Sequence, residues 1–437
     1  MLGILMFIEF RVNAEQCSMR RHTRYAIYSS ILILVTLLLG TSCGGSSKAS
    51  VPPQGLPGLT IAGASNSYVG TESSGDMWQA SIDHTSNSFS AADLTNSKSG
   101  AVLGSVVDQI GFLELAQTNV SPPFQPFGFA LEIPGRALLF RPGMNPAPLA
   151  ALVPGRCMNI NGKVTFQFVT LPDENWEAGT DAAYGTVKVS AGGTAWNFSN
   201  FTQFTLENSV QPTVPLPTGM CSSNTAGGLV TIPPSPPGSI SATLAVGPSG
   251  IFVADQFLST ASGTLSGAAG VIQPSTSLHV SSVVSGSYLG FIYEPNVIGD
   301  PNCSTDCVAP TQMAAFSGSA TTCQTLPSSS GMCGGAFFND SLGNVKQAST
   351  DTTIELGTED SSNFGLYKSA RVTIPNPAGS PGSCKAPGIS GTDSQNNPTC
   401  TLPAIAVVGN PEDKFAIFLI AQDAVNNSPM VIYLFQQ

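Results

Sequence analysis

The sequence predicts an all-β protein, in which antiparallel meanders and hairpins form one or two barrel, sandwich or propeller-like β-units. Three observations predict this class. The 437 residues include 45 Gly and 33 Pro, which together with abundant Ser and Thr are typical of many turns between short strands. Apolar and polar residues alternate beside these turn signals, and helical periodicity is nearly absent. An even number of cysteines in the region after residue 43 predicts disulfide-stapled loops.

The chain opens with a basic segment and an apolar run. Arg20, Arg21 and Arg24 precede the run "AIYSSILILVTLLLG" at residues 26–40. A membrane-spanning helix needs roughly 20 apolar residues, so this shorter run fits the apolar region of a signal peptide. We expect residues 1–42 to be a signal peptide, with residues 1–18 as an over-extended start.

The apolar run is followed by "GTSC", which ends at Cys43. Over residues 19–43 the chain resembles a bacterial lipoprotein precursor. The resemblance implies cleavage before Cys43, acylation of its thiol and its new amine, and anchoring in a lipid bilayer by the acyl chains. Gly44 stands where many inner-membrane lipoproteins have Asp, so the resemblance implies the outer membrane, facing the periplasm or the cell surface. An ordinary secretory signal and an uncleaved anchor are the alternatives.

The charge balance excludes one class of partner. Without residues 1–42 the chain has 12 Lys and Arg against 25 Asp and Glu, a net charge of −13. Nucleic-acid binding requires clustered basic residues, so no nucleic-acid partner is expected. Hydrophobic residues make up 42% of the chain, which argues against a disordered acidic protein.

Composition also divides the chain. Residues 43–58 have the Gly, Ser and Pro content of a flexible lipidated tether. We expect a first β-unit at 59–210 and a second at 239–437. Between them, the Pro-rich segment 211–238 is interpreted as a linker or as a surface crossover within one domain.

Turn residues between alternating segments predict the hairpins of the first half. Asn161-Gly162 is the strongest short hairpin signal, because both residues tolerate positive φ. In 194–200, Trp196 and Phe198 alternate with polar residues and should share one face. The other predicted strand pairs are 76–83 with 88–94, 128–133 with 137–142, and 184–190 with 194–200.

The last third of the chain predicts a meander of three strands, at 404–409, 414–421 and 430–436. The segment 415–420, "FAIFLI", is apolar at every position. We therefore expect a central strand that is covered on both faces.

Eight cysteines follow residue 43, and their clustering suggests local bridges. The expected pairs are Cys303 with Cys307, Cys323 with Cys333, Cys384 with Cys400, and, by elimination, Cys157 with Cys221. The Cys-bearing loops near 295–335 and 376–402 should project from one rim or edge. "CSTDC" lacks a partner motif and a nearby His, so no metal site is expected.

Few residues offer catalytic chemistry. His84 and His279 are the histidines after residue 43, and we interpret them as a solvated turn residue and a polar strand residue. The serine-esterase, zincin and P-loop motifs do not occur after residue 43, and no cofactor is expected. Glu132 and Asp255 lie in apolar segments, where salt bridges to Arg136 or Arg141 would satisfy them.

One acidic segment is a candidate ligand loop. Carboxylates near an indole could bind a sugar or calcium, although a solvated surface loop is the simpler interpretation. The candidate residues are Asp173, Glu174, Trp176, Glu177 and Asp181.

These observations favour a non-catalytic binding or surface-scaffold role for an exported protein, with an unidentified envelope or extracellular ligand, because rigid β-frames often bind through their loops. The alternative is a secreted carbohydrate-active enzyme with paired carboxylates.

Overall fold

The computed structural model describes a set of segments that all lie within the unit Val51–Gln437. Most of these residues are in β-strands, so the all-β prediction is confirmed. No helix in these segments is long and apolar enough to span a membrane. The described residues are 67–72, 77–94, 102–109, 112–117, 125–140, 150–155, 157, 159–170, 182–211, 213, 215–222, 228–234, 241–259, 265–293, 311–318, 331–339, 345–347, 352–375, 384, 388–393, 396–423 and 428–437.

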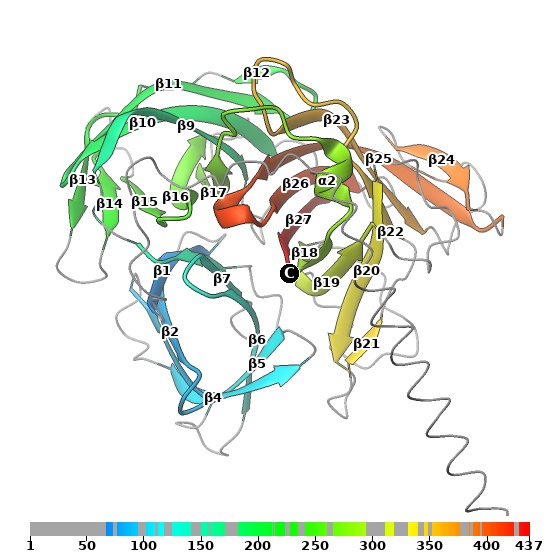
Figure 1. Ribbon diagram of the computed structural model, residues 1–437, viewed down its shortest axis with the longest axis horizontal. Coiled ribbons are helices and arrows are strands. Elements are labelled where there is room, and N and C mark those ends of the chain that lie inside the picture. Colours follow the sequence, from blue (N-terminus) through cyan, green and yellow to red (C-terminus); the bar gives the residue numbers. More distant parts are fainter. Residues whose placement is uncertain are drawn as a thin grey trace, which may run out of the picture. The chain divides into compact units, whose positions relative to one another are not determined.

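The described strands form closed antiparallel barrels of eight strands each, and each barrel is continuous in sequence (Figure 1). In the first barrel every strand pairs with the next, and β8 closes onto β1 with Val153 opposite Val69. Its strands, blue to teal in Figure 1, are β1 (Ser67–Glu72), β2 (Met77–Asp83), β3 (Ser88–Asp93), β4 (Val102–Gln109), β5 (Phe112–Gln117), β6 (Gln125–Ile133), β7 (Ala137–Phe140) and β8 (Ala150–Val153).

The second barrel, green in Figure 1, closes through the pairing of β10 with β11. Strand β12 adds to the outer end of β11 and is not part of the ring. The strands are β9 (Ile160–Thr170), β10 (Ala183–Gly192), β11 (Ala195–Thr205), β12 (Val210–Gln211), β13 (Gly219–Ser222), β14 (Leu229–Ile232), β15 (Ala242–Val246), β16 (Ile251–Ser259) and β17 (Leu265–Ile272).

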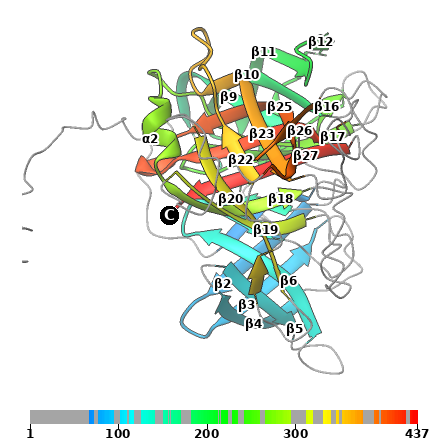
Figure 2. The same cartoon turned by 90° about the vertical axis from the view of Figure 1, so that its right-hand side faces the viewer.

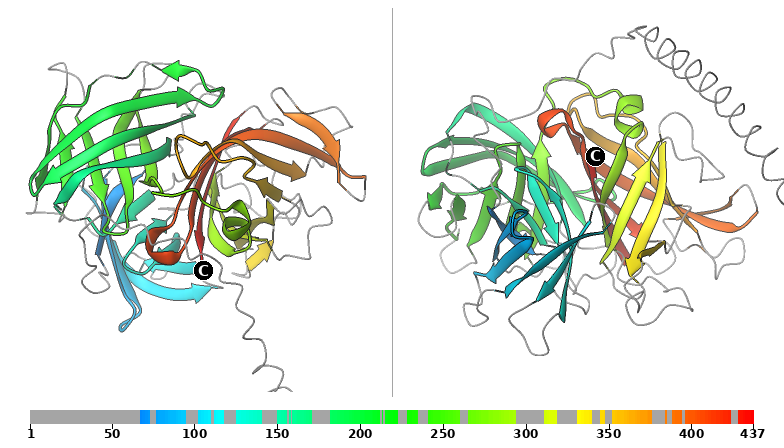
Figure 3. Two further views of the ribbon diagram at one scale, coloured as in Figure 1. Left: turned by 45° about the horizontal axis from the view of Figure 1, so that its top comes forward. Right: turned by 60° about the horizontal axis from the view of Figure 1, so that its bottom comes forward.

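The third barrel closes through β19 and β20, and its long strands are seen from two further directions in Figure 3. Strands β21 and β24 are additions, on β20 and β25 respectively. The strands are β18 (Ser287–Tyr293), β19 (Thr311–Ser317), β20 (Gly331–Asn339), β21 (Val345–Gln347), β22 (Thr352–Glu355), β23 (Leu366–Pro375), β24 (Ile389–Thr392), β25 (Pro398–Gly409), β26 (Ala416–Asp423) and β27 (Ser428–Gln436).

Each barrel encloses an apolar cluster of its own. Ile82 and Phe89 belong to the cluster of the first barrel, Phe168 and Trp196 to that of the second, and Leu419 to that of the third. Trp196 is fully buried and Phe198 packs beside it in the same cluster, so the predicted shared face of these two aromatics is confirmed. The alternation along each strand leaves the opposite face pointing out of the barrel.

A fourth apolar cluster lies outside the barrel interiors and combines residues from all three barrels. Strand β26 shows how it forms: Ile417 and Leu419 face the third barrel's interior, while Phe418 and Ile420 belong to the common cluster. The prediction of a strand covered on both faces is therefore confirmed. We call this fourth cluster the common core.

Specific contacts join the barrels at the common core. The rings of Phe112 and Phe291, from the first and third barrels, meet edge to face with centroids 5.8 Å apart. The hydroxyl of Tyr433 in β27 donates to the carbonyl of Thr170 in β9 at 2.8 Å. Gly409 lies so close to the second barrel that a Cβ on it would be 2.7 Å from Val271 Cβ. Any larger residue at Gly409 would force β25 away from β17.

The segment between the second and third barrels is also held in place. It contains the short helix α2 (Val280–Val284), visible in Figure 2, and Val283 and Val284 pack into the third barrel's interior cluster. Glu359, in the loop before β23, accepts hydrogen bonds from Leu278 N at 3.1 Å and from the Ser277 hydroxyl. The loop thereby fixes the connection through which the chain passes from one barrel to the next.

The predicted hairpins correspond to β2–β3, β6–β7 and β10–β11, and the terminal meander to β25, β26 and β27. The hairpin expected at Asn161-Gly162 is wrong. Both residues lie inside β9, where the register with β10 shifts between Val189 and Ala191. Gly162 has φ +79°, a conformation that serves a β-bulge as well as a hairpin turn.

In the described part of the chain, the boundaries of the barrels differ from the unit boundaries that the composition suggested. Strands β13 and β14 lie within the Pro-rich segment 211–238 and complete the second barrel. The Pro residues flank short strands, where their missing N–H does not interrupt a long ladder.

Buried tyrosines give this fold a predictable response to alkali. Burial, followed by the Asp360 charge, raises the pKa of Tyr184 to about 12. Burial likewise raises the pKa of other phenols in the first and third barrels, in each case above the ordinary value of 10.0. These are Tyr68, Tyr288, Tyr367 and Tyr433.

Because the folded state holds these protons more tightly than the unfolded chain, the contribution of these tyrosines to the free energy of unfolding should be constant below about pH 10 and fall above it. We expect phenolate absorbance near 295 nm to appear together with the loss of β-sheet circular dichroism. Tyr184→Phe should make the alkaline loss of stability shallower. Phenolate formation at pH 10 by most of these tyrosines in a folded protein would contradict the burial described here.

Candidate functional site

The structure describes part of the residue set that the sequence singled out. Several candidates lie outside the described residues, namely Cys43, Arg141, Asp173, Glu174, Trp176, Glu177, Asp181, Cys303, Cys307 and Cys323. The lipidation site and the acidic ligand loop therefore remain predictions.

Two predicted disulfides are present. Cys157 and Cys221 have Cα atoms 5.6 Å apart and link residues separated by 64 positions. Cys384 and Cys400 have Cα atoms 5.8 Å apart and a separation of 16. Cys333 is disulfide-bonded as well. The first bridge staples the second barrel internally, and the second pins a hairpin to the third barrel.

That hairpin, which we call the stapled hairpin, comprises Cys384, β24, the turn residues Asp393, Asn396 and Asn397, and the start of β25. Strand β24 pairs with the first residues of β25, with Ile389 opposite Thr401 and Thr392 opposite Pro398. In Figure 1 the orange β24 lies at the outer end of β25. The loop expected to project near 376–402 thus contains a strand that the sequence did not reveal.

Asp393 fixes the turn of the stapled hairpin. Its carboxylate accepts hydrogen bonds from the backbone N–H and the side-chain amide of Asn397, both at 2.8 Å. Asn396 adopts φ +65°, which Asn tolerates better than most residues. These bonds hold the two strands in register at the end opposite the disulfide.

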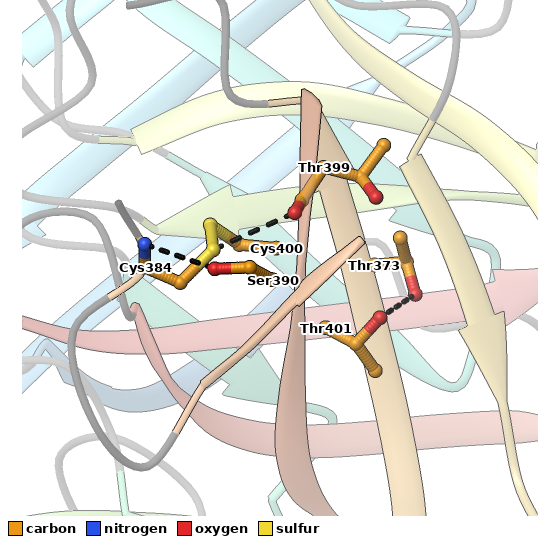
Figure 4. Close-up of a disulfide and its surroundings, with 6 residues drawn as sticks. All are labelled: Thr373, Cys384, Ser390, Thr399, Cys400 and Thr401. Carbon is orange, nitrogen blue, oxygen red and sulfur yellow. Dashed lines mark hydrogen bonds between the residues drawn. A yellow bond between two sulfur atoms is a disulfide. The ribbon is translucent and has the colours of Figure 1, made fainter. Parts of the chain in front are cut away.

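The disulfide end of the stapled hairpin is equally well held (Figure 4). Cys400 is fully buried, and Cys384 packs against the third barrel's interior cluster. Cys384 N donates to the Ser390 hydroxyl at 3.3 Å, and Cys384 Sγ lies 3.5 Å from the Thr399 carbonyl oxygen. The bridge therefore ties β24 to a buried point of the barrel.

Although it is rigidly held, β24 is open to solvent. All four of its residues are exposed, and Ile389 retains 63% of its accessible surface. An exposed apolar side chain on a rigid strand is a feature of binding surfaces. A short run of Ile, Ser, Gly and Thr within a Gly- and Pro-rich loop offers little strand signal, which is why sequence reasoning missed it.

The first barrel contains a buried polar cluster that also differs from expectation. Glu132 was expected to pair with Arg136 or Arg141, but its carboxylate accepts a hydrogen bond from the Tyr68 hydroxyl at 2.6 Å and pairs with the His84 ring. The side chain of Glu132 is 4% exposed and that of His84 is 54% exposed. His84 therefore lies in a turn, as expected, but is paired there with a buried carboxylate.

Tyr68 could not have been identified from local sequence, because it lies 64 residues from Glu132. The tyrosine completes the cluster by accepting a hydrogen bond from Gly135 N at 3.3 Å. Burial, together with the neighbouring Glu132, raises the pKa of Tyr68, so it remains a neutral donor. The cluster links β1 to β6 and to the turn between β6 and β7.

Other described acidic residues have local partners. Burial opposes ionisation of Asp360, but hydrogen bonds from Lys368 at 2.9 Å and from Ser362 N outweigh it and lower the pKa of Asp360. Lys368 also lies 5.8 Å from the centroid of Phe204 in the second barrel. Asp83 accepts bonds from the β2–β3 turn, which lower its pKa. Asp255 is buried in β16, opposite Thr243.

His279 is not on a strand as expected. It precedes α2 and accepts hydrogen bonds from Ser282 N and Val283 N through its carbonyl. Within the described part of the chain, no group of three or more His, Cys, Asp and Glu side chains could hold a metal ion.

Comparison with known proteins gives no assignment. No family model matches the sequence, and no curated protein matches it either. Among solved structures, a tryptophan-to-alanine variant of transferrin-binding protein B from Haemophilus parasuis is 9% identical with a TM-score of 0.23. The match covers 82% of this chain and 65% of that one, which is less than two thirds of its length.

A second similar structure is a predicted outer membrane protein from Bacteroides fragilis. It is 11% identical with a TM-score of 0.17, and the match covers 63% of this chain and 96% of that one. At such scores neither structure indicates what this chain binds or does. The candidate site is therefore argued from its own geometry.

The Cys384–Cys400 bridge should control the order of β24. In the chain-entropy account, a bridge over 16 residues constrains the unfolded chain by about 3 kcal/mol. With Cys384→Ala and Cys400→Ala, we expect the amides of β24 to lose more protection against deuterium exchange than those of β9, which lose only the global stability that the bridge contributes.

The paired variant Cys157→Ala, Cys221→Ala is the matched control, since it removes a bridge from another barrel and should lower the protection of β24 by no more than that of β9. Equal protection of β24 with and without its own bridge would show that the disulfide does not hold the strand.

Proposed function

We propose that this chain is an exported lipoprotein with a non-catalytic binding role, anchored in the bilayer by acylated Cys43. The observation that carries the binding role is the stapled hairpin, which presents an exposed strand on a rigid support. The signal-peptide and Cys43 segment of the sequence supports the export and the anchor.

The rigidity of the support favours binding. A surface that is already ordered loses little conformational entropy when a ligand docks on it, so more of the contact energy appears as affinity. The stapled hairpin is fixed at one end by Cys384–Cys400 and at the other by the Asp393 turn. Its barrel is joined to the other two through the common core.

The disulfides support an exported location, because such bonds persist in oxidising compartments and are rare in the cytosol. Bridges occur in both the second and the third barrel, so the fold depends on oxidation in two places. The outer membrane remains the proposed destination, because Gly44 stands where many inner-membrane lipoproteins have Asp.

A carbohydrate-active enzyme is the less favoured alternative. It would need two carboxylates roughly 5–10 Å apart on either side of a bound sugar. The described carboxylates with direct partners have structural roles. Glu132 bonds within the first barrel, and Glu359 holds the connection before the third barrel. Asp360 pairs with Lys368 of the third barrel, and Asp83 and Asp393 fix turns.

The anchor is tested by the intact mass of the mature N-terminal peptide after expression of the precursor in a diderm bacterium. We expect a peptide that starts at acylated Cys43 and a protein in the membrane fraction. Cys43→Ala should abolish both, and Cys17→Ala, a control within the leader, should change neither. An unmodified N-terminus at another residue would contradict the anchor.

The binding role is tested by hydroxyl-radical footprinting of residues 384–400 on intact cells and on the purified protein. Protection of the stapled hairpin on cells is the expected result. Equal modification in both settings would argue against a bound partner.

A further inference from the structure

We propose that the stapled hairpin binds an extended polypeptide segment of another protein, which adds as a further strand to the edge of β24 that no described strand occupies. This inference rests on the proposed binding function and names the class of its ligand. It follows from the backbone of β24, from its side-chain pattern and from the charge of the chain.

One edge of β24 is paired, and no described strand occupies the other. Among the described strands it pairs with β25 alone, through the positions Ile389 to Thr392. The peptide N–H and C=O groups on its other edge are spaced for a neighbouring strand. Such groups are the hydrogen-bonding partners in strand addition, whereas pockets for side chains give specificity.

The edge of β24 is short but lacks the charged residues and Pro with which proteins commonly protect such edges. Short length, Lys and Pro are typical protections. The other added strands show two of these: β12 has only two residues, and β21 carries Lys346. Strand β24 is four residues of Ile, Ser, Gly and Thr without charge or Pro.

The pleat of the hairpin shows which face would contact a ligand side chain. The Ser390 hydroxyl is directed to Cys384 N, so Ser390 and Thr392 face the disulfide side. Ile389 lies on the opposite face, beside Thr401, whose hydroxyl is bonded to that of Thr373 at 2.9 Å. Figure 4 shows Thr373 and Thr401 next to each other on this face.

Thr373, Thr401 and Ile389 therefore form a cross-strand row over β23, β25 and β24. An added strand would place its own residue next to Ile389 and extend the row. Cross-strand neighbours of β-branched residues are most favourable when they are β-branched or aromatic. The expected ligand thus has Val, Ile, Thr or Tyr at alternating positions.

Charge argues for another protein over a second copy of this chain. The chain carries a formal net charge of −11, and two copies meeting along a short edge would repel each other. A neutral or basic segment avoids this repulsion. We therefore assign the edge to an extended, uncharged or basic segment with β-branched or aromatic residues.

The test uses a synthetic library of capped linear heptapeptides, with Val, Ile, Thr, Tyr and Lys at randomised positions. Peptides are selected on the mature protein and measured by fluorescence polarisation. Ile389→Lys should weaken the selected peptide by about tenfold or more, because it removes the apolar contact and adds a charge at the edge. Val210 in β12 is exposed, as Ile389 is. Val210→Lys is therefore the matched control and should leave the affinity for the peptide unchanged.

A second probe separates strand addition from side-chain contact alone. The selected peptide is resynthesised with alternate backbone nitrogens methylated, in both registers. One of the two methylated peptides should lose binding, because its methyl groups replace the N–H hydrogens that would have bonded to β24. The other peptide, whose methyl groups point away from β24, should still bind.

Equal affinity for wild type and Ile389→Lys, or equal binding of both methylated peptides, would overturn the proposal. Failure to select any peptide, or a dimer in light scattering that Ile389→Lys dissolves, would overturn it too. The footprint on intact cells distinguishes these failures from failure of the binding role, since protection of 384–400 does not depend on how the ligand binds.

Discussion

Burial of strands on both of their faces is the constraint on which the rest of this structure depends. A closed eight-stranded barrel needs apolar residues only on its inner face, yet β26 is apolar on both. Its inward residues, Ile417 and Leu419, fill the third barrel, and its outward residues, Phe418 and Ile420, enter the common core with residues of the other two barrels. Without that core these outward side chains would face water, at roughly 25 cal/mol for each Å² of apolar surface.

The common core explains why the polar contacts between barrels take the form they do. The Tyr433 hydroxyl donates to the Thr170 carbonyl, and the Gln167 side-chain amide donates to the Phe364 carbonyl, so at each of these joints a buried side-chain donor bonds to backbone of the neighbouring barrel. Such a frame can hold a projecting element in one orientation. The stapled hairpin benefits from this, because its anchor Cys400 lies within β25, a strand that also contributes Ile405 and Val407 to the common core.

Much of the local structure could be predicted from the sequence, because it depends on neighbours in the chain. The hairpins β2–β3 and β10–β11, the terminal meander and the Cys384–Cys400 bridge are of this kind. Similar local reasoning failed at Asn161-Gly162, because positive φ fits a bulge as well as a turn. It failed for Glu132 because Tyr68 and His84 are distant in sequence. The number of barrels was not predictable either, since ring closure depends on which distant strands pair.

The central claim is that the three barrels share one core and therefore unfold together. Hydrogen exchange measured by mass spectrometry, on wild type and on Phe418→Ala, tests it most directly. Truncating Phe418 should cost about 3–5 kcal/mol, and the account predicts that protection falls by the same amount in β1, β9 and β26. A loss confined to the strands of the third barrel, with β1 and β9 unchanged, would show that the barrels are independent and would contradict the account.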